Sequence, residues 1–200
     1  MAEMPFVSSL VQEDLPVWQQ CLDTEFLRRM EDGTLDEACF KGYIVEDSLY
    51  LREYAKVFAW GMTKARTMET LRNYYSLLGF VQESEDVTRL HYLEQFGLSE
   101  ADLQALPLRP ENRAYVDYML NAAKNADDAV DCMMACLPCM LSYSWIFQKL
   151  LKEHPAVQDA PAIPVETLTK DAPYYAYQAC LLYTSPSPRD RQKPRMPSSA

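Results

Sequence analysis

The sequence is poor in glycine and histidine and has no long apolar run, and each shortage narrows the class of protein. Five glycines among 200 residues, with an apolar share of 48%, are typical of a helix-rich globular domain rather than a glycine-punctuated β-protein. A membrane span needs about eighteen consecutive apolar residues, and no such run occurs. We therefore expect one all-α domain with a substantial core and no membrane partner.

The net charge and the cysteine content limit the possible binding partners of the protein and its cellular location. The formal net charge is −10, which argues against nucleic acid as a partner because nucleic acid carries charge of the same sign. The first residues lack the basic start and apolar core of a secretory signal, so a cytoplasmic location is expected. In that compartment six cysteines are more typical of free, catalytic or metal-bound thiols than of a disulfide framework.

Composition changes sharply at Cys180. Residues 180–200 hold four of the thirteen prolines and four of the nineteen basic residues, with Asp190 as their one acid. Such a segment is typical of a disordered tail. Residues 180–190 also resemble the translation of a transposase-adapter end used in DNA library preparation. We therefore expect a truncated helical domain over residues 1–179 and a non-native tail over residues 180–200.

Apolar residues recur with the 3.6-residue period of helices, and helix-ending residues stand between the periodic segments. This pattern predicts an all-α bundle with helices over residues 10–30, 36–66, 68–78, 83–96, 111–124 and 128–153, a short helix after Ser99 and the start of another at 174–179. Several single residues predict its details: Pro16 in a first turn, Thr34 with Glu37 as a capping box, Gly33 and Gly97 at helix ends, and bends at Gly61 and Pro138.

One face of the second predicted helix combines a carboxylate with phenols. Tyr43, Asp47, Tyr50 and Tyr54 stand at i, i+4, i+7 and i+11, so they share a face. Large aromatic bodies favour burial, and a carboxylate among them suggests a site for a flat polar ligand. We expect Asp47 to point inward and the opposite face, which carries polar residues, to point outward: Lys41, Glu46, Ser48 and Glu53.

Cys139 follows Pro138 on the last long helix and is a candidate nucleophile. A thiolate attacks electron-poor carbons such as those of a pyrimidine, although a free cysteine is more often a buried apolar filler. Together with Cys136 it also spells C-x-x-C, which can indicate redox chemistry or half of a zinc site. The remaining candidates are most simply packing residues: Cys21, Cys39, Cys132 and His91.

The succession of these residues resembles the TenA-type thiaminase II, or aminopyrimidine aminohydrolase, family over residues 6–153. Its most specific parts are Glu46-Asp47 with Tyr50, and Pro138-Cys139 with Tyr143. The resemblance implies a heme-oxygenase-like helical bundle, assembled as a homotetramer, that needs no metal or cofactor. It also implies a small-molecule pyrimidine substrate and a role in thiamin salvage.

Carried over residue by residue, the resemblance makes Cys139 the nucleophile that adds to the aminopyrimidine ring. Asp47 would hydrogen-bond the ring nitrogen and amino group, and three phenols would line the pocket: Tyr50, Tyr115 and Tyr143. The chain departs from the family where a late helix supplies an acid/base glutamate. Glu166 lies in a proline-rich connection over residues 154–173 and is a poor substitute, so we expect the bundle to lack its C-terminal helices and this chain to be impaired.

Three functions stay open at this point. The leading one is Cys139-dependent hydrolysis of aminomethylpyrimidine to hydroxymethylpyrimidine, and of thiamin as a further substrate. The second is a non-catalytic pyrimidine-binding or regulatory protein of the same fold. The third is a thiol-redox protein that uses the C-x-x-C pair.

Overall fold

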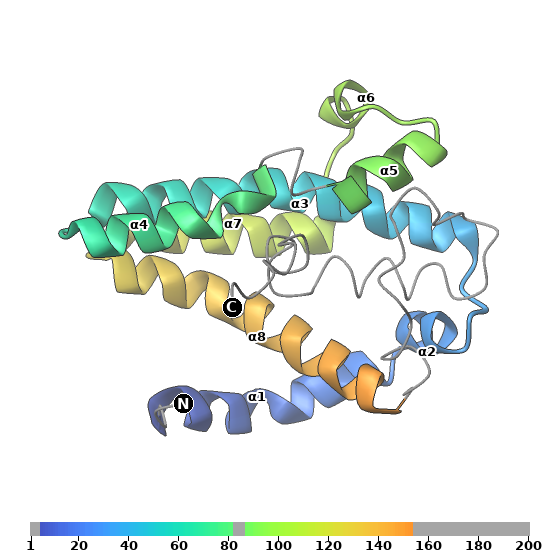
Figure 1. The fold of residues 1–200 in the computed structure, drawn as a ribbon, viewed down its shortest axis with the longest axis horizontal. Coiled ribbons are helices and arrows are strands. Elements are labelled where there is room, and N and C mark those ends of the chain that lie inside the picture. The colour runs from blue at the N-terminus through green and yellow to red at the C-terminus, as the bar shows by residue number, and fades with distance from the viewer. Residues whose placement is uncertain (1–4, 82–86, 154–200) are drawn as a thin grey trace, which may run out of the picture.

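The computed structural model of the chain describes residues 5–81 and 87–153, and every regular element within these ranges is a helix (Figure 1). In chain order these are α1 (Pro5–Leu22), α2 (Glu25–Glu31), α3 (Glu37–Lys64), α4 (Met68–Leu77), the 3-10 turn η1 (Gly79–Val81), α5 (Val87–Gln95), α6 (Glu100–Gln104), α7 (Pro110–Asn125) and α8 (Ala129–Glu153). The predicted all-α class is confirmed.

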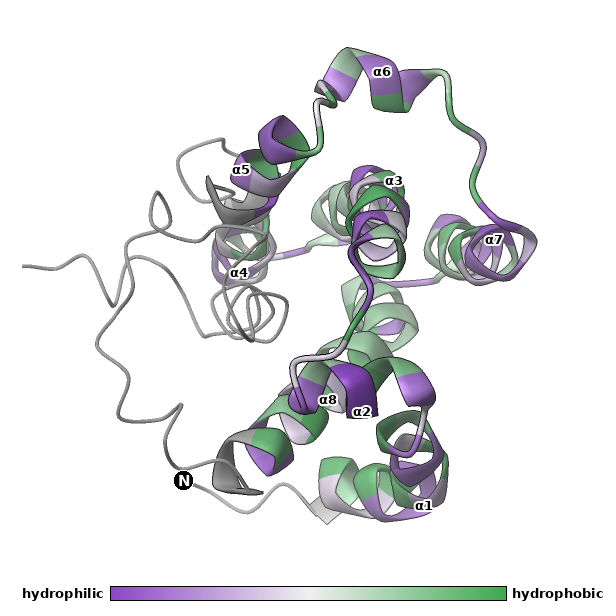
Figure 2. Ribbon diagram, turned by 90° about the vertical axis from the view of Figure 1, so that its right-hand side faces the viewer, coloured by the Kyte–Doolittle hydropathy of each residue, from purple (hydrophilic) through white to green (hydrophobic). Residues whose placement is uncertain are grey.

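Helix α3 is the centre of the bundle. It packs against α4, α5, α6, α7 and α8, and Figure 2 shows it surrounded by these helices when the bundle is viewed from one end. Helix α1 lies apart from α3 and packs on α8 and α2. Because neighbours cover α3 on several sides, its residues are buried around most of its circumference. The five predicted site residues lie on α3 and on its neighbours α7 and α8.

The first predicted helix is wrong as a single element, since the chain breaks between α1 and α2. Thr24 is the N-cap of α2, and its hydroxyl accepts a hydrogen bond from the Leu27 backbone N–H at 3.4 Å. Threonine favours this position because its side chain replaces a missing helical acceptor. Pro16 lies inside α1 rather than in its first turn.

The start of α3 also differs from the predicted capping box. Asp36 is the N-cap, and its carboxylate accepts from the Ala38 backbone N–H at 2.8 Å. The Thr34 hydroxyl instead donates to Asp32 at 2.5 Å. The two glycine helix ends are confirmed, since Gly33 and Gly97 have φ of 76° and 66°, in the left-handed region that glycine enters without steric cost.

Gly61 has a packing function in the contact between α3 and α4. A Cβ at this position would lie 2.1 Å from the Tyr74 ring, so only glycine lets α4 approach α3 this closely. The Tyr74 hydroxyl donates to the Ala129 carbonyl oxygen at the start of α8. Gly61 thus permits a contact that ties α4 to both α3 and α8.

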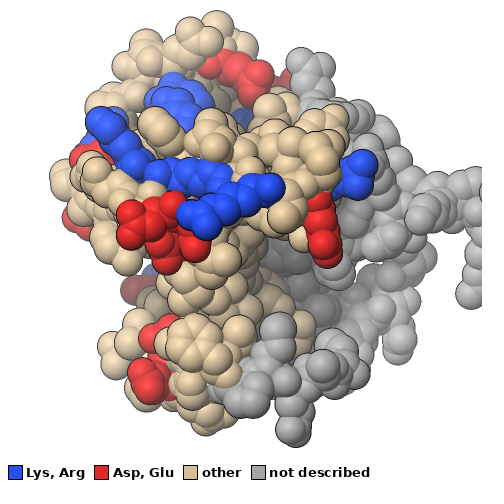
Figure 3. Space-filling model, turned by 90° about the vertical axis from the view of Figure 1, so that its left-hand side faces the viewer, with Lys and Arg blue, Asp and Glu red and all other residues tan. Residues whose placement is uncertain are grey.

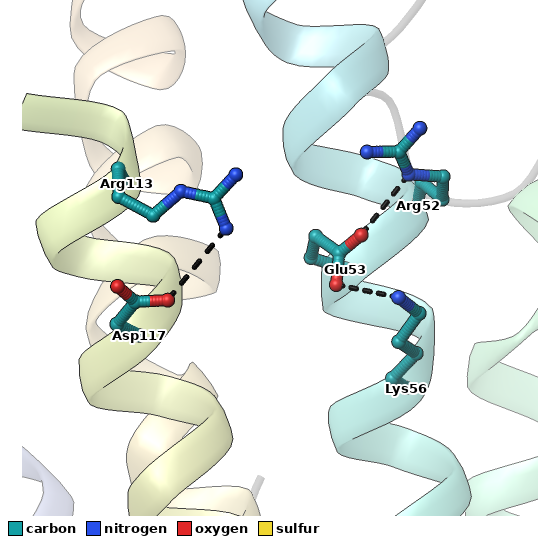
Figure 4. A network of polar contacts seen from close by, with 5 residues as sticks. All are labelled: Arg52, Glu53, Lys56, Arg113 and Asp117. Atoms are coloured by element: carbon teal, nitrogen blue, oxygen red, sulfur yellow. Dashed lines mark hydrogen bonds and ion pairs between the residues drawn. The ribbon is translucent and has the colours of Figure 1, made fainter. Parts of the chain in front are cut away.

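The polar face of α3 is not uniformly outward, contrary to prediction. Ser48 and Glu53 are both buried. Helices α5 and α6 cover the side of α3 that carries Ser48, whereas Glu53 lies on the side of α3 that faces α7 (Figure 4). Glu53 is neutralised by two cations of its own helix, Arg52 Nε at 3.0 Å and Lys56 Nζ at 2.6 Å (Figure 4). Buried charge is tolerated when it is paired in this way.

Two further predictions concern exposure. Cys132 is buried as predicted, but Cys21 and Cys39 are exposed and therefore not core residues.

In α8, residues Ala129–Leu150 are long and apolar enough to cross a membrane by length and composition. This is weak evidence of a span, because α8 packs on α1, α3 and α7 as a helix of the bundle.

Charged side chains of both signs share the end of the bundle where α3 and α7 finish and where α4 and α8 begin. Figure 3 shows a run of basic side chains across that face with acidic side chains beside it. The predicted connection over residues 154–173, the helix start at 174–179, Glu166 and the tail at 180–200 lie outside the described residues.

Candidate functional site

A pocket of about 450 Å³ lies between α3, α7 and α8, and all five predicted site residues line it. Asp47 and Tyr50 come from α3, Tyr115 from α7, and Cys139 and Tyr143 from α8. The rest of the lining is more polar: Tyr43, Glu46, Arg109, Glu111 and Asn112. Residues more than ninety positions apart in the sequence thus meet in one cavity.

Helical spacing sets the aromatic wall of the pocket. Tyr50 lies one turn from Asp47 on α3, and its ring faces Tyr115 across the α3–α7 contact. The two rings are parallel within 5°, with centroids 6.0 Å apart, and Tyr50 also stacks on Tyr54 at 5.1 Å. Tyr143 follows Cys139 by one turn of α8. Parallel phenol faces of this kind suit a planar ring.

Asp47 is the buried charge of the pocket, with 9% of its surface exposed. Its inward orientation is as predicted, because it shares a face of α3 with Tyr43, Tyr50 and Tyr54. A carboxylate held beside apolar ring bodies interacts strongly with hydrogen-bond donors and positive charge, since little water screens it. The pocket therefore favours a ligand with N–H groups or a cationic ring.

The Cys139 thiol lies beside both Tyr50 and Asp47. Burial raises the pKa of Cys139, hydrogen bonding with the Tyr50 hydroxyl, which also donates to Met119 Sδ at 3.7 Å, lowers it, and the negative charge of Asp47 raises it. Burial also holds the pKa of Tyr50 and of Tyr115 above the usual range of a phenol. Both phenols are therefore neutral hydrogen-bond donors at physiological pH.

Comparison with known proteins identifies the family of the chain. Residues 12–179 match the TENA/THI-4/PQQC family. The chain belongs to the TENA/THI-4/PQQC family. It is similar to the aminopyrimidine aminohydrolase of Halalkalibacterium halodurans, with 32% identity over 79% of this chain and 70% of that protein. It is also similar to the aminopyrimidine aminohydrolase of Helicobacter pylori, with 30% identity over 76% of this chain and 69% of that protein.

Solved structures agree on the fold. The TenA homologue from P. horikoshii OT3 superposes with a TM-score of 0.68 at 21% identity, over 90% of this chain and 85% of that one. A TenA family transcription regulator from Silicibacter sp. TM1040 superposes with a TM-score of 0.65 at 22% identity, over 89% of this chain and 77% of that one. The predicted heme-oxygenase-like helical bundle is confirmed.

The C-x-x-C pair is poorly placed for redox chemistry in this family member. Cys136 is completely buried, and burial together with the neighbouring Cys139 raises its pKa to about 12. Residues three apart on a helix have Cβ atoms about 5–6 Å apart, whereas a disulfide needs about 3.5–4.5 Å. A bond between Cys136 and Cys139 would therefore require α8 to unwind locally.

No metal site accompanies the pocket in residues 5–81 and 87–153, where no group of three or more His, Cys, Asp or Glu side chains could hold an ion. His91 lies on α5 and pairs with Gln95 one turn later. It is thus a hydrogen-bonded packing residue, as predicted. The functional roles predicted for the five pocket residues stay predictions, as do the homotetramer and the cytoplasmic location.

The sequence analysis missed the polar mouth of the pocket. Glu46 was expected to be on an outward face, yet it accepts hydrogen bonds from Asn112 Nδ2 at 2.8 Å and from the Arg109 backbone N–H at 3.3 Å. Its position next to Asp47 in the motif was a usable signal. Nothing local in the sequence predicted its partners, which lie more than sixty residues away.

Proposed function

We propose that the pocket hydrolyses aminomethylpyrimidine to hydroxymethylpyrimidine and ammonia, as a step of thiamin salvage. The observation that carries this proposal is the meeting of a thiol, a buried carboxylate and four phenols in one cavity of about 450 Å³. Two relatives at 30% identity or above are named aminopyrimidine aminohydrolase, which supports the choice of substrate class. Thiamin is the second substrate in the proposal.

Asp47 would hold the aminopyrimidine by its polar edge. A 4-aminopyrimidine presents a ring nitrogen beside an exocyclic amino group, and a carboxylate can accept from the amino group and from the ring N–H of the protonated form. Protonation makes the ring a better electron acceptor. The parallel phenols Tyr50 and Tyr115 would cover the ring and fix its plane relative to Cys139.

Cys139 would supply the electron pair. Its sulfur forms a bond to an electron-poor ring carbon, and the C–N bond of the aminomethyl arm breaks as ammonia leaves. A water molecule then adds its oxygen to the arm, one of its protons is released, and the C–S bond breaks to restore the thiolate. The net reaction consumes one water and exchanges an amine for a hydroxyl group without any redox change.

Substrate binding would also activate the nucleophile. The charge of Asp47 helps to keep Cys139 protonated. A cationic aminopyrimidine on Asp47 neutralises that charge, so the pKa of Cys139 falls when the substrate is in place. The thiolate would then form only beside the ring that it attacks, while Tyr50 stabilises it through its hydroxyl.

The step that needs a general acid limits this chain. Among the described carboxylates of the pocket, Glu46 is held by Arg109 and Asn112, and Glu111 is exposed at the mouth. Neither of these two lies buried beside Cys139, and Asp47, which does, is occupied by the substrate in this proposal. Within residues 5–81 and 87–153, protonation of the departing amine would therefore rely on water. We therefore expect slow turnover from this 200-residue chain.

The test measures ammonia release from 4-amino-5-aminomethyl-2-methylpyrimidine with the protein in excess, beside calorimetric binding of the same compound. We expect binding and slow release from the wild type, binding without release from Cys139→Ser, and wild-type behaviour from Cys39→Ser, which replaces an exposed cysteine. Binding without release in the wild type would favour the non-catalytic function. Full release by Cys139→Ser would overturn the mechanism.

A further inference from the structure

Helix α3 carries a charged side chain at each end of its neighbour α7. At the start of α7, the Glu46 carboxylate accepts from the Arg109 backbone N–H at 3.3 Å and pairs with Arg109 Nε at 3.6 Å. At the far end, Lys64 Nζ donates to the carbonyl oxygens of Lys124, at 3.3 Å, and Ala126. Figure 4 shows the two helices side by side.

The negative charge of Glu46 and the positive charge of Lys64 are opposite in sign to the partial charges at the two ends of α7. The first N–H groups of a helix and its last carbonyl groups have no partner within the helix, and they give the N-terminus a partial positive and the C-terminus a partial negative charge. The N-cap of α7 is Arg109, which makes no side-chain capping hydrogen bond. Glu46 and Lys64 thus act from α3 as the caps that the sequence of α7 does not provide.

The Glu46 contact sets the position of α7 near the pocket. Asn112 Nδ2 donates both to the Glu46 carboxylate, at 2.8 Å, and to the Glu46 backbone carbonyl, at 3.0 Å. These two contacts fix both the distance between α7 and α3 and the position of α7 along the axis of α3. One turn further on along each helix, Tyr50 meets Tyr115. Lys64 lies eighteen residues after Glu46, about 27 Å away at 1.5 Å per residue.

We propose that Glu46 is a positioning residue of the pocket, which fixes Tyr115 parallel to Tyr50 through its hold on the first turn of α7. The parallel rings at 6.0 Å define the wall of the slot that receives a planar ring. Lys64 makes the same kind of contact too far away to affect that slot. The choice of an aminopyrimidine as ligand rests on the proposed function, whereas the placement of Tyr115 does not.

A carboxylate fits this position better than its amide. Glu46 receives the Arg109 backbone N–H, the Arg109 side chain and Asn112 Nδ2, all of which are donors. A glutamine would accept with its oxygen but turn its own N–H groups toward one of these donors. We therefore expect Glu46→Gln to keep part of the contact and Glu46→Ala to lose all of it.

The experiment compares Glu46→Ala and Glu46→Gln with the matched control Lys64→Met in the full chain. Three quantities are measured: urea unfolding, calorimetric binding of 4-amino-5-aminomethyl-2-methylpyrimidine, and the rate at which iodoacetamide alkylates Cys139, resolved from the other cysteines by peptide mapping. The alkylation rate measures how accessible the Cys139 thiol is inside the pocket, and this measurement needs no substrate.

We expect Glu46→Ala and Lys64→Met to lower stability by similar amounts, because each removes one cap of α7. Glu46→Ala should also weaken pyrimidine binding about tenfold, the loss expected for about 1.4 kcal/mol, and speed alkylation of Cys139 severalfold. Lys64→Met should change neither, and Glu46→Gln should lie between Glu46→Ala and the wild type.

Equal alkylation rates in all three variants and the wild type would overturn the positioning role and leave Glu46 as a stabilising cap. If Glu46→Ala does not fold, the comparison of Glu46→Gln with Lys64→Met decides the same question. A wild type that binds no pyrimidine, with the alkylation contrast intact, would refute the proposed function and support the positioning role.

Discussion

Two carboxylates of α3 are equally buried and differ in almost everything else. Asp47 and Glu53 are 9% and 8% exposed and stand six residues apart on the same helix. Glu53 is paired with Arg52 and Lys56, and these hydrogen bonds outweigh the effect of burial and lower its pKa. Asp47 lies in a pocket with phenols and a thiol, where its own charge raises the pKa of Cys139.

The comparison shows that burial of a charge does not by itself mark a functional site. Glu53 has cations of its own helix close by, so its charge is satisfied within the fold. Asp47 lies beside the Cys139 thiol and faces a cavity large enough for a small ring. Asp47 is thus placed where it can bind a ligand, whereas Glu53 is not, and substitution of each residue can test this difference.

The largest expected effect is the contrast between Asp47→Asn and Glu53→Gln in ligand binding. Asp47→Asn keeps the shape but removes the charge that would hold a protonated ring, and charge-assisted hydrogen bonds of this kind contribute about 1.5–3 kcal/mol. We expect pyrimidine binding to weaken by roughly ten- to a hundredfold. Glu53→Gln lies outside the pocket and should leave binding unchanged. Calorimetry on the two variants measures the contrast directly.

Equal weakening by both substitutions would show that the loss comes from a general disturbance of α3. An unchanged affinity in Asp47→Asn would remove the central element of the proposed function. Circular dichroism of both variants controls for the integrity of the bundle.

The position of Asp47 was predictable from the sequence, whereas the pairing of Glu53 was only partly so. The i, i+4, i+7 spacing with three tyrosines places Asp47 on a core-facing stripe. Helical periodicity identifies one buried face, but it does not reveal that a central helix such as α3 is covered on several sides. Ser48 and Glu53 were therefore predicted to be outward, although Lys56 stands at the i+3 position where it can pair with Glu53.

The other predictions that were confirmed rest on signals between neighbouring residues, and most of the features that were missed rest on contacts between residues far apart in the sequence. The helix end at Gly97 and the short helix after Ser99 were predicted because their signals act within a few residues of chain. The hold of Glu46 on Arg109 joins residues 63 positions apart, so no window of sequence contains it. The break at Thr24 was missed because the apolar period continues across it from Trp18 to Met30.

A smaller effect concerns the titration of Cys139. Asp47→Asn removes a negative charge that raises the pKa of this thiol, so the pKa should fall and the thiol should react at lower pH. Tyr50→Phe removes the hydrogen bond that favours the thiolate, so the pKa should rise. The pH dependence of iodoacetamide alkylation at Cys139, followed by peptide mapping, measures both shifts. Shifts of the same sign in the two variants would contradict this arrangement.

The smallest effect expected is the contribution of Glu53 to stability. The partners of Glu53 are about half exposed, and ion pairs of that kind contribute about 0.2–1 kcal/mol. Glu53→Gln should lower the free energy of unfolding by up to about 1 kcal/mol at neutral pH. Glu25→Gln breaks the pair with Arg29 on α2, in which both side chains are more than half exposed. It is the matched control and should lower the free energy of unfolding by less.

The contribution of Glu53 to the free energy of unfolding should decrease as the pH falls. The pKa of Glu53 is lowered in the folded protein, so its contribution is complete above the unfolded value of about 4.3 and is lost as pH falls through the lower folded value. Urea unfolding of the wild type and Glu53→Gln should therefore differ at neutral pH and converge below about pH 4. A difference that persists unchanged into acid would mean that Glu53 stabilises α3 through packing of its side chain rather than through its charge.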